Sequence, residues 1–253
     1  RILRTHILRP TWHFVSPADL RWMLSVSGPR VNAVNAHYYR KSGLDAAVFA
    51  RSRRAIERAL AGGTHLTRLE LAAVLDKAGI QAAGQRLAYL MMRAELDGVI
   101  CSGARRGKQS TYALLDERAP RAAATTREEA LAMLATRYFT SHGPATLRDY
   151  VWWSGLTVKD AKTGIDAAGK VLQNVTIDTR VHWLAPSRMR VPAPGSTLHL
   201  LPNYDEYLIA YKDRGSIRDG KPAASVPVSL AFPHFLIIDG KLRGTWKRSI
   251  RAG

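Results

Sequence analysis

One arrangement of helices and strands occurs twice in this chain, and it constrains the fold more than any other feature. In the first copy, Thr67 and Glu70 form a capping box, which marks the start of a helix. The expected helices lie at 52–60, 67–79 and 85–96, and the expected strands at 99–103 and 109–115. The third helix carries an apolar face at helical spacing, formed by Leu87, Leu90, Met91 and Ala94. Three helices followed by a hairpin predict a winged-helix unit at 52–118.

The second copy keeps the same order with less detail. Thr126 and Glu129 form another capping box. The second helix ends at Gly155, as its counterpart ends at Gly79. The expected helices lie at 126–139, 146–155 and 157–172, and the strands lie within 175–184. Two copies of one unit form an internal repeat, so a further winged-helix unit is predicted at 126–188.

The opening segment contains two short strand-like runs around an Arg-Pro turn. The expected cross-strand pairs are Ile7 with Trp12 and His6 with His13. A shift of one residue in the loop would break these pairs. A helix should follow at 17–25, with Ser16 as its N-cap. We interpret 1–51 as the wing and connecting helix of a unit whose helices precede Arg1, and therefore expect the chain to be a fragment.

The last part of the chain, 189–253, has a different character. Pro192, Pro194 and Gly195 mark a linker. Strand-rich runs follow at 198–211, 226–232 and 235–246, with a polar loop at 215–225. Within the last run, Asp239-Gly240 lies between alternating residues and indicates a type I′ hairpin. The predicted fold class is α+β, with tandem winged-helix units followed by a small antiparallel β-barrel-like domain.

Positive charge is the most unusual property of the composition. The chain has 38 Lys and Arg against 20 Asp and Glu, a formal net charge of +18. Such a charge is informative about binding partners and not about the fold. Nucleic acid is the commonest polyanion that a basic protein meets. The alternative is that a GC-rich genome, indicated by the abundance of Arg and Ala, inflates the basic residues.

Cysteine content and apolar runs limit the compartment and the cofactors. With one cysteine, Cys101, the chain forms no intrachain disulfide and no cysteine metal cluster, which is typical of a reducing cytoplasm. No apolar run approaches the roughly 20 residues of a membrane span, and no signal peptide is recognised. P-loop, dinucleotide-binding, zinc-protease and nucleophile-elbow motifs are absent. We expect a cytoplasmic, nucleoid-associated protein with no cofactor, no metal and no membrane partner.

Three groups of residues are candidates for contact with DNA. The first is the wing tip, formed by Arg105, Arg106, Lys108 and Gln109. A basic exposed turn suits a phosphate or minor-groove contact, although it is also typical of a solvated hairpin tip. The second is Arg86 and Arg93, one heptad apart on what is expected to be the outer face of the third helix. Their alternative is a solvated helix face.

The third group lies on the opening hairpin and consists of Arg4, His6, Arg9, Thr11 and His13. Several donors on one short hairpin could hold a phosphate backbone or polarise a leaving base. The alternative is that the two histidines are structural and hydrogen-bonded.

Asp205 and Glu206 lie beside aromatic residues and could perform acid-base chemistry. Adjacent residues of a strand point to opposite faces, so they are not expected to act on one atom together. The structural interpretation of Asp205 is a helix cap or an ion pair with an arginine.

Four segments, in order along the chain, resemble the bacterial winged-helix DNA glycosylases of the AlkZ and YcaQ type. They are RTHILRPTWHFV at 4–15, FTSHGPAT at 139–146 with WSGL at 153–156, LPNYDEY at 201–207, and DGKLRGTW at 239–246. The resemblance implies three winged helices and a terminal β-barrel around a DNA channel. It also implies a Gln-x-Gln or Gln-x-Asp motif that holds the hydrolytic water. That motif is expected before Arg1, so no catalytic residue is named in this chain.

The function implied is that of a monofunctional glycosylase. Such an enzyme hydrolyses the N-glycosidic bond of alkylated purines or unhooks interstrand crosslinks in double-stranded DNA, and we expect it to act as a monomer. The alternative is a non-catalytic winged-helix DNA-binding protein or transcriptional regulator.

Overall fold

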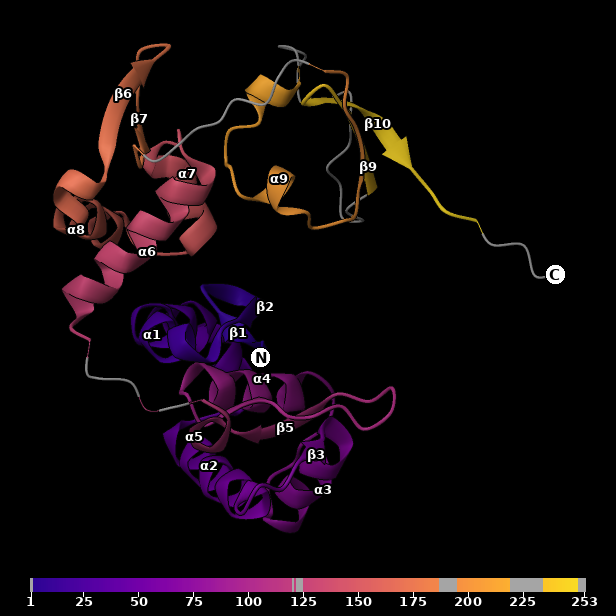
Figure 1. The fold of residues 1–253 in the computed structure, drawn as a ribbon. Helices are drawn as coiled ribbons and strands as arrows, with labels where there is room; N and C mark the ends of the chain where they lie inside the picture. The colour runs from indigo at the N-terminus through magenta and orange to yellow at the C-terminus, as the bar shows by residue number, and fades with distance from the viewer. Residues whose placement is uncertain (1, 120, 122–124, 187–194, 219–233, 250–253) are drawn as a thin grey trace. The chain divides into compact units, whose positions relative to one another are not determined.

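The computed structural model describes residues 2–119, 121, 125–186, 195–218 and 234–249. The chain divides into two compact units, one formed by 1–134 with 154–167 and the other by 135–153 with 168–253. Both are mixtures of helices and small antiparallel sheets (Figure 1). Among the described residues, no helix is long and apolar enough to cross a membrane.

The chain begins with a hairpin of β1 (Leu3–Ile7) and β2 (Arg9–Val15), followed by the long helix α1 (Pro17–Lys41). The observed cross-strand pairs are Thr5 with His13, His6 with Trp12, and Ile7 with Arg9. The predicted register is therefore wrong by one residue. Leu8 adopts a positive φ of 63° and closes the turn alone, so that Arg9 belongs to the second strand. Pro10 is tolerated because a two-stranded sheet has only edge strands.

Helix α1 is much longer than the predicted 17–25 because it continues through Pro29. Gly28, just before this proline, lies against the backbone of α4: a Cβ at this position would lie 2.7 Å from the carbonyl oxygen of Leu96. Tertiary packing of α1 on α4 therefore holds the helix where the local sequence favours its end.

The next elements of the first unit follow the predicted order. They are α2 (Ala46–Leu60), β3 (Leu66–Thr67), α3 (Arg68–Lys77), α4 (Gly84–Leu96), β4 (Ile100–Ser102), β5 (Thr111–Leu114) and the short α5 (Leu115–Arg118). The strands form one antiparallel sheet in the order β3-β5-β4. The capping box of Thr67 and Glu70 is confirmed. Helix α2 begins earlier than predicted, because Asp45 caps it by accepting a hydrogen bond from the Val48 amide.

The core of this unit surrounds α4. Helix α4 packs against α1 and β1, and also contacts α2 (Figure 1). The four residues of its predicted apolar face, Leu87, Leu90, Met91 and Ala94, are all buried, as expected. Because neighbours cover α4 on several sides, most of its surface is removed from water.

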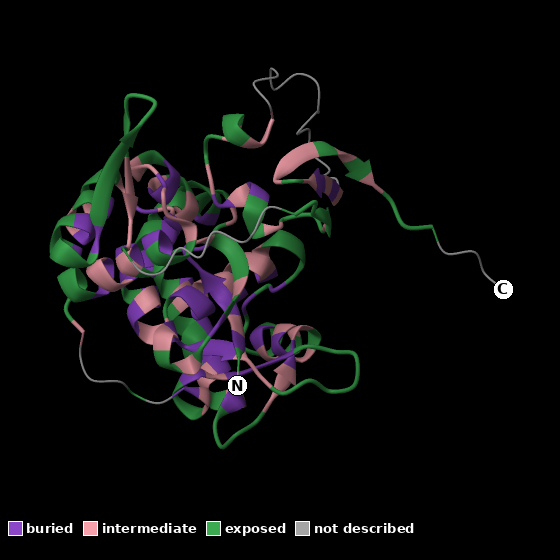
Figure 2. Ribbon diagram, turned by 45° about the horizontal axis from the view of Figure 1, so that its top comes forward, coloured by how far each residue is buried: buried purple, intermediate pink, exposed green. Residues whose placement is uncertain are grey.

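Three helices and a hairpin follow. They are α6 (Arg127–His142), α7 (Leu147–Ser154), α8 (Val158–Ala168), the 3-10 turn η1 (Gly169–Val171), β6 (Gln173–Ile177) and β7 (Arg180–Leu184). Both hydrogen bonds of the predicted Thr126–Glu129 capping box are present. In the second unit the β6–β7 hairpin stands beside α7, and its tip is exposed (Figures 1 and 2). Just before α7, Ala145 pairs with Trp183 of β7.

The last described elements are β8 (Leu198–Leu201), α9 (Glu206–Ile209), η2 (Gly215–Ile217), β9 (His234–Ile238) and β10 (Lys241–Trp246). The strands form an antiparallel sheet in the order β10-β9-β8. The type I′ turn is confirmed, since Asp239 and Gly240 both have positive φ. The run 198–211 is only partly a strand, because α9 replaces the strand after Leu201. The predicted strand at 226–232 and most of the polar loop lie outside the described residues.

Candidate nucleic-acid interface

The opening hairpin places cationic and aromatic side chains on one face. Register and strand alternation put Arg4, His6, Trp12 and Phe14 on this face, which we call the hairpin face. The guanidinium carbon of Arg4 lies 4.5 Å from the ring centroid of Trp12. The Trp12 side chain is 46% exposed and that of Phe14 80% exposed. Cations next to exposed aromatic rings are what a nucleic-acid surface uses to hold phosphates and stack bases.

A buried carboxylate contacts two side chains of the hairpin face. Glu95 of α4 is fully buried, and its Oε2 atom is bonded to Nδ1 of His6. The same oxygen accepts a hydrogen bond of 3.3 Å from the Trp12 indole nitrogen. The His6 and Trp12 rings also contact each other, with centroids 5.0 Å apart. Glu95 therefore fixes the positions of His6 and Trp12. The Arg4 guanidinium lies over the Trp12 ring and depends on its position.

The remaining hairpin candidates are arranged differently. His13 lies on the opposite face from Arg4 and His6, and its Nδ1 atom lies 3.1 Å from the carbonyl oxygen of Thr11. Arg9 lies at the turn, where a Cβ on Gly155 would approach its Cγ atom to 3.2 Å. The structure therefore brings Arg4 and His6 together and separates them from His13.

The wing tip between β4 and β5 is exposed throughout its basic segment. Arg106 and Gln109 pair through their backbones across the turn. The Arg106 guanidinium lies 2.7 Å from Oε1 of Glu70 and donates to the carbonyl oxygen of His65. Arg105 donates to the carbonyl oxygen of Lys108, whose ammonium has no partner among the described residues.

Glu70, in the first turn of α3, connects this helix to the wing tip. The backbone amide of Thr67 first, and the Arg106 guanidinium second, hold the pKa of the Glu70 carboxyl at about 2 instead of its ordinary 4.5. The carboxylate thus serves the cap of α3 and the wing tip together.

Arg86 and Arg93 do not lie on an open helix face, because α4 is enclosed by its neighbours. The Arg86 guanidinium donates to the carbonyl oxygens of Gln81 and Ser42. The Arg93 guanidinium lies 2.6 Å from Oδ2 of Asp97 and 4.8 Å from the Phe49 ring centroid. Both side chains are partly buried and bonded within the chain. Their role as DNA contacts remains a prediction, but the expected free face is not present.

Two features of the hairpin were not identified from the sequence. Trp12 and Phe14 alternate on an edge strand with no apolar partner, a pattern that predicts exposed aromatic rings. Glu95 lies eight residues after Leu87 and four after Met91, so helical spacing places it on the buried stripe of α4. A carboxylate on such a stripe needs a buried donor, and that requirement was the available signal.

A protein-family model described as DNA glycosylase AlkZ-like matches residues 1–251 of the chain. The chain belongs to this AlkZ-like DNA glycosylase family. The Streptomyces sahachiroi DNA glycosylase AlkZ has a similar fold, with a TM-score of 0.80 and 22% sequence identity, over 97% of this chain and 70% of that chain. At this identity the likeness concerns the fold. Among curated proteins, none matches the chain.

Residues in or next to the segments that resemble the AlkZ-like family are hydrogen-bonded to one another within the second unit. Trp152 donates its indole hydrogen to the carbonyl oxygen of Ile209, at 3.0 Å. The hydroxyl of Tyr211 donates to the carbonyl oxygen of His142, at 2.9 Å. Tyr207 in turn donates to the carbonyl oxygen of Gly240, at 2.7 Å. Of these three bonds in the AlkZ-like chain, the one from Tyr207 to Gly240 joins two of the resembling segments directly.

Asp205 has the structural role that was expected of it. It caps the short helix α9, and its Oδ1 atom accepts a hydrogen bond from the Tyr207 amide. Glu206 accepts a bond of 3.4 Å from the Trp153 indole. Among the described residues of this AlkZ-like chain, no cluster of three or more His, Cys, Asp or Glu side chains could hold a metal.

Proposed function

We propose that the protein is a monofunctional DNA glycosylase that hydrolyses the N-glycosidic bond of alkylated purines in double-stranded DNA. Membership of the AlkZ-like family supports glycosylase chemistry on DNA. The observation that carries the proposal for this chain is the hairpin face, where Arg4 lies over Trp12 and Phe14 is exposed beside them. We propose that the protein acts as a monomer on cytoplasmic, nucleoid-associated DNA.

The proposed chemistry is consistent with a site that contains cations and rings. Alkylation at N7 or N3 places positive charge on a purine and makes it a good leaving group. The sugar then develops oxocarbenium character, and water attacks it without a metal. In this chemistry, Arg4 would neutralise phosphate beside the lesion, and Phe14 and Trp12 would stack against bases. An interstrand crosslink cannot be flipped out of the duplex, so an open surface of this kind also suits its unhooking.

We also propose that the chain contains tandem winged-helix units at 52–118 and 126–188. In both, a residue before the second helix pairs with the second strand of the hairpin. Thr67 pairs with Thr111 in the first, and Ala145 pairs with Trp183 in the second. Under this proposal 1–51 is the wing and connecting helix of another unit, and 189–253 is a barrel-like domain.

A non-catalytic DNA-binding protein is the second candidate, and one observation favours it. Glu95, the carboxylate next to the hairpin face, is fully buried and bonded to His6 and Trp12. In this position it holds side chains in place and is not available to activate a water on the surface. A regulator would need only the cationic side chains and the wing in order to bind DNA, and no catalytic group.

Base release from a defined duplex separates the two candidates. The protein is incubated with a duplex that contains one N7-methylguanine, and strand cleavage by mild alkali then reports each abasic site. We expect lesion-dependent cleavage and none with undamaged DNA. Tight binding that leaves the methylated base in place would support the regulator instead.

Phe14→Ala tests the hairpin face itself, with Leu69→Ala as the matched control. Leu69 lies on α3 and is 77% exposed, similar to Phe14 at 80%, so neither change removes core packing. Loss of one base–aromatic stack costs about 1–3 kcal/mol. We therefore expect Phe14→Ala to reduce DNA affinity or base release about 5- to 150-fold. Equal behaviour of the two variants would remove the hairpin face from the proposal.

A further inference from the structure

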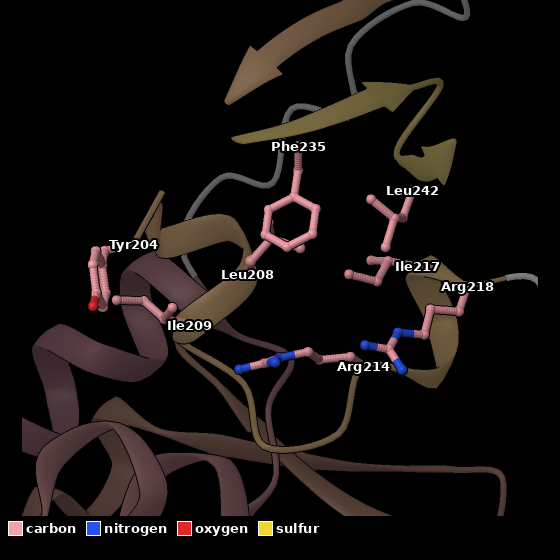
Figure 3. Close-up of a pocket in the computed structure, with 8 residues that line it drawn as sticks. All are labelled: Tyr204, Leu208, Ile209, Arg214, Ile217, Arg218, Phe235 and Leu242. Carbon is pink, nitrogen blue, oxygen red and sulfur yellow. The ribbon is translucent and has the colours of Figure 1, made fainter. Parts of the chain in front are cut away.

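The second unit contains a cavity with two arginines at its edge (Figure 3). Its apolar wall is formed by Leu208, Ile217, Phe235 and Leu242, with Tyr204 and Ile209 at one side. Arg214 and Arg218 border the opposite edge: the Arg214 side chain extends along it towards Ile209, and the Arg218 guanidinium lies near the backbone end of Arg214. These arginines belong to neither the hairpin face nor the wing tip.

Neither guanidinium has a hydrogen-bond or ion-pair partner among the described residues, and the Nε atoms of both are buried. Burial, and then the positive charge of Arg218, lowers the pKa of Arg214. An arginine does not relieve such repulsion by losing its proton at physiological pH. Two partly buried like charges that have no partner among the described residues favour the binding of an anion.

Among the described residues, the carboxylate next to this pair in the sequence is already occupied. Asp213, next to Arg214 in sequence, has one oxygen 2.5 Å from the Arg180 guanidinium. Its other oxygen accepts a bond from the Gly215 amide. These contacts hold the pKa of Asp213 below its ordinary value, with the Gly215 amide as the larger cause. Asp213 is therefore committed to Arg180 and η2, and none of the described carboxylates forms an ion pair with Arg214 or Arg218.

We propose that Arg214 and Arg218 form a phosphate-group site that holds a backbone phosphate of bound DNA. Two planar guanidiniums offer paired N–H donors that match the oxygens of a phosphate group. The apolar wall excludes water on one side, which strengthens the contact. Exposed Lys212 adds positive charge in the adjoining segment. The assignment to DNA rests on the proposed function, whereas the recognition of a phosphate group does not.

The double variant Arg214→Gln/Arg218→Gln tests this site, with Lys170→Gln as the control. Lys170 also belongs to the second unit, but it is exposed and does not line the cavity. The first readout is the affinity for an undamaged duplex at several KCl concentrations. When one phosphate is no longer neutralised, the slope of log K against log salt falls in magnitude by about 0.9. We expect this decrease in the double variant and an unchanged slope in the control.

The second readout uses inorganic phosphate alone, by thermal unfolding at constant ionic strength against chloride. We expect phosphate to raise the Tm of the wild type and of Lys170→Gln, and not that of the double variant. The double variant should fold as stably as the wild type in chloride, because it removes a like-charge pair. Arg214→Lys/Arg218→Lys keeps the charge and should retain the salt slope, with weaker stabilisation by phosphate.

The outcomes separate the site from the proposed function. If the double variant keeps both the salt slope and the phosphate stabilisation, the site is wrong. Loss of phosphate stabilisation with an unchanged DNA slope would assign the site to free phosphate and overturn the DNA contact. If the wild type binds no DNA, the proposed function fails, and the phosphate readout alone decides whether the anion site exists.

Discussion

Replacement of Glu95 by alanine is the most informative single change for the first unit. The side chain is fully buried, and its Oε2 atom is bonded to His6 and Trp12. The alanine variant leaves the buried His6 ring and the indole N–H of the half-exposed Trp12 without their acceptor, and a space where the carboxylate was. Loss of this buried acceptor, together with the space that it leaves, costs about 3–5 kcal/mol. For a unit of this size, that destabilisation lowers Tm by about 6–20 °C.

Glu95→Gln separates the charge from the shape of the side chain. The amide keeps one acceptor oxygen for His6 or Trp12, so we expect a smaller destabilisation of about 1–3 kcal/mol. Glu57→Ala is the matched control: Glu57 makes an i,i+4 contact of 2.8 Å with the exposed Arg53 on α2. An exposed pair of this kind contributes at most about 0.5 kcal/mol.

The assay is urea unfolding at pH 7, followed by far-UV circular dichroism, with affinity for duplex DNA measured on the same samples. A double-mutant cycle with His6→Ala should give a coupling of about 1–3 kcal/mol, because the two side chains are in contact. If the free energy of unfolding of Glu95→Ala lies within about 1 kcal/mol of the wild-type value, the structural role given to this buried contact is wrong. A stable Glu95 variant with unchanged DNA affinity would also show that the hairpin face needs no support from α4.

Three further predictions concern the wing, the α3 cap and the thiol. Replacing Arg105, Arg106 and Lys108 together by Gln should weaken duplex binding and reduce the magnitude of the slope of log K against log salt by up to about 0.9 for each phosphate that the wing neutralises. The same change at the exposed residues Arg51, Arg54 and Arg58 of α2 should leave this slope unchanged. Equal slopes for the two triple variants would exclude the wing as a DNA contact. Because the pKa of Glu70 is lowered from 4.5 to about 2 in the folded protein, its contribution to stability is present above pH 4.5 and is lost as pH falls from 4.5 towards 2. The Tm difference between the wild type and Glu70→Gln should therefore be largest at pH 7 and shrink below pH 4.5, and a difference that stays constant down to pH 3 would contradict the assignment. Burial raises the pKa of the Cys101 thiol to about 12, so a disulfide reagent at pH 8 should modify it slowly in the native protein and rapidly in urea, and similar rates would refute its burial.

Features with a local cause were predicted well from the sequence. The capping boxes at Thr67 and Thr126 and the turn at Asp239-Gly240 depend on residues within three or four positions of each other. The apolar face of α4 also follows from helical spacing alone. For these elements the local sequence and the folded structure agree, so the residues of the element itself are sufficient to predict it.

Features that depend on distant packing were not predicted. Helix α1 continues through Pro29 because it packs closely on α4, and the hairpin register depends on a positive φ at Leu8. The same reason explains the interface: Arg93 is held by Asp97 and Phe49 instead of facing solvent. Glu95 could be placed on a buried stripe, but only the fold shows that His6 and Trp12 meet it there.

Single-turnover release of N7-methylguanine from a duplex, with protein in excess over DNA, tests the central claim most directly. We expect release of the free base at a rate well above spontaneous depurination, and an abasic site in the strand. We also expect slower release with Phe14→Ala and unchanged release with Leu69→Ala. Saturated binding of the duplex, without release beyond the spontaneous rate, would contradict the account and leave a DNA-binding protein without glycosylase activity.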